Sequence, residues 1–180
     1  MMQANVNSPV IRAMQTSDLE QVMAVQVACY HPAYHEPLSV LKQRLQDVPQ
    51  TAWVAVDAQG VAGYLVSYLS CWGKITPLHH NFERADQPDL LYIHDLAIDP
   101  RLGGQGVAAR LIQTAVAAAQ RQHLRGLGLV AVQDALGFWQ RYGFELMQQL
   151  SPQQQINLAS YGVSAVYLHA DLLGVAQMLG

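Results

Sequence analysis

The stretch from Leu90 to Ala119 constrains the fold most, because an apolar strand, a glycine turn and a long helix follow one another directly. Leu90–Ile98 reads LLYIHDLAI, which is typical of a central strand, and Asp99-Pro100 ends it. Residues 101–106 (RLGGQG) form a tight turn, and from Val107 to about Gln122 apolar side chains recur at helical spacing. A second apolar strand is expected at residues 127–132. This order predicts a mixed α/β or α+β fold.

The remaining elements are shorter and alternate along the chain. Ser17, with Glu20 three residues later, has the spacing of a capping box and predicts a helix start. The expected strands cover residues 10–14, 51–56, 61–69, 144–149 and 164–170, and the expected helices cover residues 17–30, 38–48 and 134–141. We expect the strands at 51–56 and 61–69 to form a hairpin. A long irregular segment, residues 70–89, interrupts the pattern and suggests a functional loop.

Length and composition exclude several classes of protein. The 180 residues, 51% of them hydrophobic, fit one folded domain over residues 10–180 after a frayed segment at residues 1–9. A formal net charge of −3 gives no basic patch for nucleic acid. No run of residues reaches the length of a membrane span, and two cysteines make no disulfide framework. We therefore expect a cytoplasmic protein without nucleic-acid or membrane partners, whose strand edges would allow a homodimer.

The glycine turn before the long helix has the chemistry of a phosphate site. The first N–H groups of a helix have no partner within the helix and carry the positive end of its dipole. Glycines let an anion approach these groups closely. A competing interpretation is a dinucleotide fingerprint, Gly104-x-Gly106-x-x-Ala109. That motif requires an acidic residue about 20 positions later, and residues 124–129 (LRGLGL) contain none.

The run LAIDPRLGGQGVAARLI resembles motif A of the GNAT acetyltransferase superfamily. The family pattern is Arg/Gln-x-x-Gly-x-Gly/Ala; Gly106 and Ala108 fill its last two places, and Gly103 stands in the first. A second stretch, residues 135–144 (ALGFWQRYGF), resembles the family's Ala-x-x-Phe-Tyr-x-x-x-Gly-Phe. The order of elements from Ile11 to Leu172 is similar too, so the resemblance spans nearly the whole chain. Residues 94–98 (HDLAI), and residues 134–136 (DAL) before Phe138, resemble runs in one subgroup of the superfamily, the arylalkylamine N-acetyltransferases.

The resemblance implies a GNAT-like fold, a mixed and mostly antiparallel twisted sheet flanked by helices, with acetyl-CoA at the strand–turn–helix unit. It implies that the backbone of Leu96 and Ile98 pairs with the pantetheine arm and that amides near Leu96 polarise the acetyl carbonyl. The implied cofactor-binding residues are Leu96, Ala97, Ile98, Gly103, Gly104, Gln105, Gly106, Val107, Ala108, Ala109, Asp134, Phe138 and Trp139.

His94 is the candidate catalytic base, because imidazole titrates near neutral pH. Strand alternation places Tyr92 and His94 on one face, and in the resembled subgroup both positions hold histidine. Trp139 stands where the family usually has a tyrosine as general acid, and an indole is a poor acid. Tyr142, one helical turn further on, is the alternative acid candidate. A satisfied, buried histidine is the structural alternative for His94.

The acceptor-binding candidates lie in two loops and are Tyr30, Tyr34, Trp72, His79 and His80. The adjacent histidines suggest a metal, but the three or four convergent ligands of a zinc site are not evident, so we expect no metal. The favoured function is acetyl transfer to a small primary amine, with an arylalkylamine as one option, by direct attack in a ternary complex. The alternatives are a protein or peptide N-acetyltransferase and a CoA-binding sensor without catalysis.

Overall fold

The computed structural model describes residues 8–180, so most of the segment expected to be frayed (1–9) lies outside the described residues. The chain divides into two compact units. The first holds the residues up to Val66 together with Asp95–Ile112, and the second holds Ser67–His94 together with Gln113–Gly180. Three elements begin in one unit and end in the other: β3 (Gly60–Ser70), β4 (Leu90–Ile98) and α3 (Val107–Arg121).

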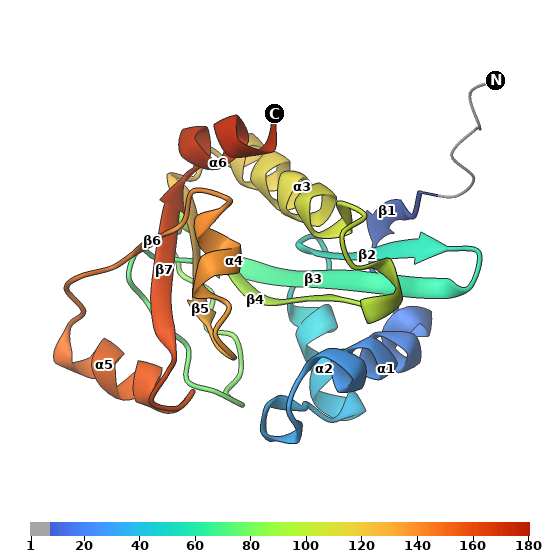
Figure 1. Cartoon of the computed structure of the whole chain (residues 1–180). Helices are drawn as coiled ribbons and strands as arrows, with labels where there is room; N and C mark the ends of the chain where they lie inside the picture. The colour runs from blue at the N-terminus through green and yellow to red at the C-terminus, as the bar shows by residue number, and fades with distance from the viewer. Residues whose placement is uncertain (1–7) are drawn as a thin grey trace. The chain divides into compact units, whose positions relative to one another are not determined.

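The first unit is built around an antiparallel hairpin. Strand β2 (Ala52–Asp57) pairs with β3, Asp57 opposite Gly60, and β1 (Val10–Ala13) pairs with the other side of β2. Helices α1 (Leu19–Cys29) and α2 (Leu38–Asp47) lie side by side (Figure 1). The hairpin expected at residues 51–69 is confirmed.

Two details of the first helix differ from the sequence prediction. A 3-10 turn (Thr16–Asp18) precedes α1, and Asp18 rather than Glu20 accepts the hydrogen bond from a cap residue, the N–H of Gln15, at 2.8 Å. The carboxylate of Asp18 also accepts a hydrogen bond from Arg12, at 2.7 Å, and this contact holds the side chain in the capping position. Val27 of α1 is 56% exposed, whereas Val25 and Gln26 are buried.

The second unit contains the parallel part of the sheet. Residues 90–92 of β4 pair in parallel with β5 (Gly126–Ala131), and β7 (Val166–Asp171) pairs antiparallel with β5. Strand β6 (Glu145–Leu146) pairs with β7 and is shorter than the expected strand at 144–149. The strand order is β1-β2-β3-β4-β5-β7-β6, which confirms the predicted mixed, mostly antiparallel sheet.

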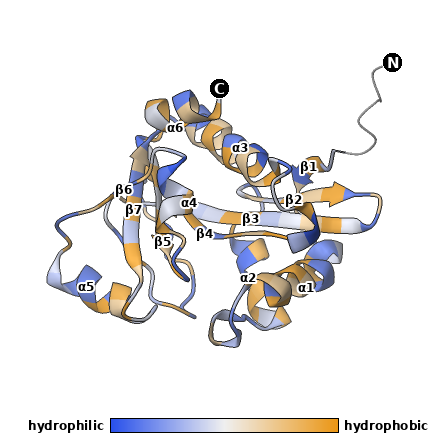
Figure 2. Ribbon diagram, in the orientation of Figure 1, coloured by the Kyte–Doolittle hydropathy of each residue, from blue (hydrophilic) through white to orange (hydrophobic). Residues whose placement is uncertain are grey.

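Helices and loops complete the second unit. Helices α4 (Leu136–Gln140) and α5 (Pro152–Ala159) precede β6 and β7, and α6 (Leu172–Leu179), which the sequence prediction missed, follows β7. In Figure 2 the exposed helix α5 carries both hydrophilic and hydrophobic residues, whereas most of β5 and β7 is buried. Residues 71–89 form no helix or strand, as predicted. Among the described residues, no helix combines the length and apolar character needed to span a membrane.

Candidate active site

The glycine turn of the first unit joins β4 to α3. A short 3-10 turn (Pro100–Leu102) follows Asp99, whose side chain accepts a hydrogen bond from the N–H of Arg101 at 3.0 Å. Gly104 and Gly106 adopt φ values of +75° and +73°, which L side chains rarely adopt. A Cβ atom on either glycine would meet nothing within 4 Å, so the space beside the turn is open. The turn can therefore admit a phosphate group to the first N–H groups of α3.

The residues of this turn are more exposed than the first residues of the helix that follows. Gly103, Gly104, Gln105 and Gly106 are exposed, whereas Val107 is buried and Ala108 and Ala109 are half-buried. The helix that follows is 15 residues long, so its N-terminal dipole is well developed. Residues 103–109, seven of the predicted cofactor-binding residues, thus lie in the glycine turn and the first turn of α3.

The C-terminal half of β4 is held by side chains from α1 and β3. The hydroxyl of Tyr30 lies 2.5 Å from Oδ1 of Asp95 and 2.8 Å from the carbonyl oxygen of Leu96. The hydroxyl of Tyr64 donates to Oδ2 of Asp95 at 2.5 Å. Burial, followed by the neighbouring Asp95 carboxylate, raises the pKa of both Tyr30 and Tyr64 well above the usual phenol value. Both phenols are therefore protonated at neutral pH.

The thiol of Cys29 also reaches this part of β4. Its Sγ donates to the carbonyl oxygen of Ile98 at 3.1 Å. Burial, and then the carboxylates of Asp95 and Asp99, raise the pKa of the Cys29 thiol. Little thiolate is present at neutral pH, which disfavours Cys29 as a nucleophile.

His94 and Tyr92 lie together in the second unit, as strand alternation predicts. The ring of His94 meets the edge of Phe82 with centroids 4.9 Å apart, and Phe82 stacks on Tyr68 at 4.3 Å. Tyr68 in turn contacts Tyr92 at 5.1 Å. His94 is half-buried, whereas Tyr92 is 1% exposed, and burial raises its pKa well above the usual value. Tyr92 is thus a core residue that remains protonated.

The second motif forms α4 and the turns beside it. Asp134, where the helix was expected to begin, is exposed at φ +60°. The helix begins instead at Leu136, with Ala135 as its N-cap residue. Trp139 is buried against Phe138 and Phe144, at 5.1 Å from each ring. Tyr142 is half-buried and contacts Phe138 at 5.2 Å. Gly143, at φ +82°, lies in the turn that follows the helix, whose C-cap residue is Arg141.

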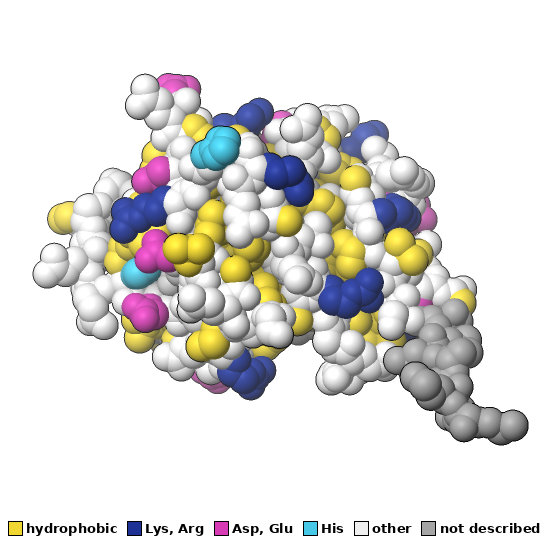
Figure 3. Space-filling model, turned by 90° about the horizontal axis from the view of Figure 1, so that it is seen from above, with side chains coloured by type: hydrophobic (Ala, Val, Ile, Leu, Met, Phe, Trp, Pro, Cys, Tyr) yellow, Lys and Arg dark blue, Asp and Glu magenta, His cyan; other side chains and the backbone are white. Residues whose placement is uncertain are grey.

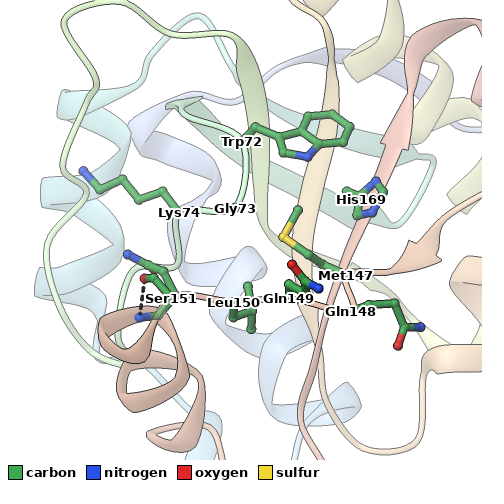
Figure 4. A pocket seen from close by; sticks show the side chains of 10 residues that line it. Trp72, Gly73, Lys74, Met147, Gln148, Gln149, Leu150, Ser151 and His169 are labelled. Atoms are coloured by element: carbon green, nitrogen blue, oxygen red, sulfur yellow. Dashed lines mark hydrogen bonds between the residues drawn. The ribbon is translucent and has the colours of Figure 1, made fainter.

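Trp72 is the acceptor candidate that the second unit holds most firmly. The guanidinium of Arg125 lies 3.8 Å from the ring centroid of Trp72, and the ring of His169 lies 4.7 Å away. These rings line an open cavity of about 750 Å³ together with residues that follow β6 (Figure 4). The sequence analysis did not predict His169, Met147 or Gln154 as lining residues. No carboxylate is among the residues that line this cavity.

The other loop candidates are placed separately. His79 and His80 are exposed, His79 at φ +64°, and neither lines the cavity around Trp72. Tyr34 is half-buried in a 3-10 turn (Pro32–Tyr34) of the first unit. A buried ion pair between Glu36 and Arg44 ties this loop to α2.

Neither metal binding nor nucleic-acid binding gains support from the described side chains. Within residues 8–180, no group of three or more His, Cys, Asp or Glu residues could hold a metal ion. On the face seen in Figure 3, Lys and Arg side chains are scattered among uncharged ones.

The mixed sheet, with an open glycine turn leading into a long helix, defines a domain that can bind a nucleotide-linked acyl donor. A profile of the acetyltransferase (GNAT) family matches residues 19–144, and the chain belongs to this family. It is an acetyltransferase domain whose cosubstrate is acetyl-CoA. No curated protein sequence matches the chain.

Solved structures show the same fold at low sequence identity. The GNAT-like decarboxylase GphF in complex with isobutyryl-CoA is 16% identical, with a TM-score of 0.72 over 91% of this chain and 99% of that one. YhbS from Escherichia coli in complex with CoA is 16% identical, with a TM-score of 0.64 over 100% and 89%. The ribosomal-protein-S18-alanine N-acetyltransferase from Escherichia coli is 12% identical, with a TM-score of 0.64 over 92% and 94%.

Proposed function

We propose that this acetyltransferase acetylates a small primary amine, with arylalkylamines as the favoured class, by direct attack of the amine. The observation that carries the cofactor part of this proposal is the pair Gly104 and Gly106, whose left-handed backbone leaves open space at the N-terminus of α3. This turn would hold the pyrophosphate of acetyl-CoA, with Gly103 and Gln105–Ala109 around it. Leu96, Ala97 and Ile98 would lie along the pantetheine arm, and Asp134, Phe138 and Trp139 would contribute from the second motif.

His94 is the proposed base. Its half-buried imidazole would take the proton that the amine loses on attack, directly or through one water. Acetyl-CoA, when bound, supplies the acetyl group as a reactive thioester. Tyr142 is the proposed proton donor to the departing sulfur, and Tyr92 supports the strand face that carries His94. The raised pKa of Cys29 favours direct transfer over an acetylated cysteine.

The acceptor would be bordered by Tyr30, Tyr34, Trp72, His79 and His80. The aromatic rings among them support an amine that carries an aromatic group, because such rings bury apolar surface and stack. The open cavity beside Trp72 favours a second candidate function, acetylation of a peptide. Its lining lacks a carboxylate for a free ammonium group but includes the carboxamides of Gln148, Gln149 and Gln154.

The test is steady-state release of CoA thiol from acetyl-CoA with tyramine, tryptamine, a polyamine and short peptides. For the best acceptor, we expect His94→Ala to lower kcat about a hundredfold or more. His123→Asn is the control, because His123 lies at the end of α3 with φ +55°, which asparagine also adopts. Intersecting initial-velocity lines are expected for direct transfer, and parallel lines would contradict it. Turnover with peptides alone would replace the small-amine proposal by the second candidate.

A further inference from the structure

The end of α1 holds one edge of β4 through two backbone carbonyl groups. Tyr30 reaches the carbonyl oxygen of Leu96, and Cys29 reaches that of Ile98. Residues two apart in a strand direct their backbone groups to the same side. The N–H of Asp99 donates to Ala62 of β3 at 2.9 Å, so the odd-numbered residues here face β3. Leu96 and Ile98 therefore direct their N–H and C=O groups away from β3.

The hydroxyl of Tyr30 is itself fixed by a second acceptor. It lies between Asp95 and the Leu96 carbonyl, while Tyr64 from β3 donates to the other oxygen of Asp95. Strand β3 also approaches β4 closely, because a Cβ atom on Gly63 would lie only 2.7 Å from Cδ1 of Ile98. The backbone of β4 at Leu96 is thus restrained from α1 on one side and from β3 on the other.

The same contacts argue against Tyr30 as a proton donor in the reaction. Loss of its proton would place a phenolate 2.5 Å from the Asp95 carboxylate in a buried environment, which is unfavourable. A group held in this way keeps its proton and acts as a fixed hydrogen-bond donor.

We propose that Tyr30 is a positioning residue for acetyl transfer: anchored on Asp95, its hydroxyl fixes the backbone at Leu96. This inference rests on the proposed function, in which Leu96 would lie along the pantetheine arm, and on the expected polarisation of the acetyl carbonyl by amides near Leu96. With the Leu96 carbonyl engaged by Tyr30, the edge of the strand presents the Leu96 N–H in one orientation. A donor fixed before the reaction stabilises developing negative charge on oxygen without reorganising.

The test compares Tyr30→Phe with Tyr161→Phe, a matched removal of one hydroxyl that also donates to a backbone carbonyl oxygen, that of Thr76 at 2.7 Å. For Tyr30→Phe we expect kcat to fall about tenfold, with KM for the amine within about twofold of wild type. The apparent pKa values of the pH–rate profile should not move, because Tyr30 transfers no proton. Tyr64→Phe, which removes the other donor to Asp95, should lower kcat in the same direction.

A second measurement does not depend on activity. In the protein without cofactor, the readout is amide hydrogen exchange at Ala97, whose N–H shares a peptide group with the Leu96 carbonyl and faces β3. This exchange should be at least tenfold faster in Tyr30→Phe than in wild type or Tyr161→Phe. An unchanged kcat or unchanged exchange at Ala97 would overturn the inference. So would an effect confined to KM for the amine, which would show that the Tyr30 hydroxyl binds the acceptor and does not fix the backbone. Loss of the alkaline limb of the pH–rate profile would also overturn it, because Tyr30 would then be the acid. If the wild-type protein transfers no acetyl group to any acceptor, the proposed function fails instead.

Discussion

The guanidinium of Arg101 binds the carboxylate of Asp57, with 2.6 Å between Nη1 and Oδ2. The two residues lie 44 positions apart, Arg101 in the glycine turn and Asp57 at the end of β2. Arg101 also donates from Nε to Asp99 at 3.0 Å. One side chain thus ties the turn that precedes α3 to the β2–β3 hairpin.

We predict that this ion pair keeps the turn in the shape needed for cofactor binding. Arg101→Met should weaken CoA binding about three- to tenfold, because the turn must then be ordered on binding. Lys42→Met, which removes one exposed positive charge from α2, is the control for net charge. Calorimetric titration with CoA measures both. Equal affinities for the two variants would show that Arg101 does not order the turn.

We predict a separate effect from the glycines of the turn. Gly106→Ala should weaken CoA binding more than tenfold, because a Cβ atom would occupy the open space beside the helix N-terminus. The positive φ adds a stability cost of about 1–2 kcal/mol. Gly137→Ala in α4, where φ is not positive and a Cβ would meet nothing within 4 Å, is the control. Thermal unfolding with and without CoA separates the two effects. Full CoA affinity in Gly106→Ala would be evidence against a phosphate at this position.

We predict that Gly126 is required to seat Trp72. A Cβ atom on Gly126 would lie 2.8 Å from the indole ring and 2.3 Å from the carbonyl oxygen of Ala170, so the backbone would have to move. Gly126→Ala should destabilise the fold by about 2 kcal/mol or more. Gly174→Ala in α6, where the Cβ would meet nothing, should be neutral or stabilising by up to about 1 kcal/mol. Denaturant unfolding measures both, and equal stability of the two variants would refute the prediction.

Buried tyrosines should limit stability in alkali. Burial raises the pKa of Tyr30, Tyr64, Tyr92 and Tyr167, so the folded protein keeps four protons that the unfolded chain releases near pH 10. The stabilisation that these raised pKa values add to the free energy of unfolding is fully present below about pH 10 and is lost as the pH rises further. Phenolate absorbance from these residues should therefore appear only together with loss of circular dichroism. Titration of all eight tyrosines near pH 10 in a folded protein would contradict this.

Local sequence patterns predicted the central strand, the glycine turn and the long helix. The apolar run of β4, the glycines at 103–106 and the periodic face of α3 are local patterns, and each element formed where its pattern predicted. Two-residue alternation also placed Tyr92 and His94 on one face. Local signals suffice here because hydrogen bonding and side-chain direction within one element depend only on neighbouring residues.

The tertiary structure decided which distant side chains meet. The sequence shows Asp95 as a carboxylate within an apolar strand. It does not show the partners of Asp95, because Tyr30 and Tyr64 lie 65 and 31 residues earlier in the chain. The capping role of Asp18 depended on Arg12, and the seat of Trp72 depended on Gly126 and Arg125. No periodicity encodes such pairs, because packing of separate elements brings them together. Tertiary packing therefore decided that the hydroxyl of Tyr30, expected only to border the acceptor, contacts the backbone of β4.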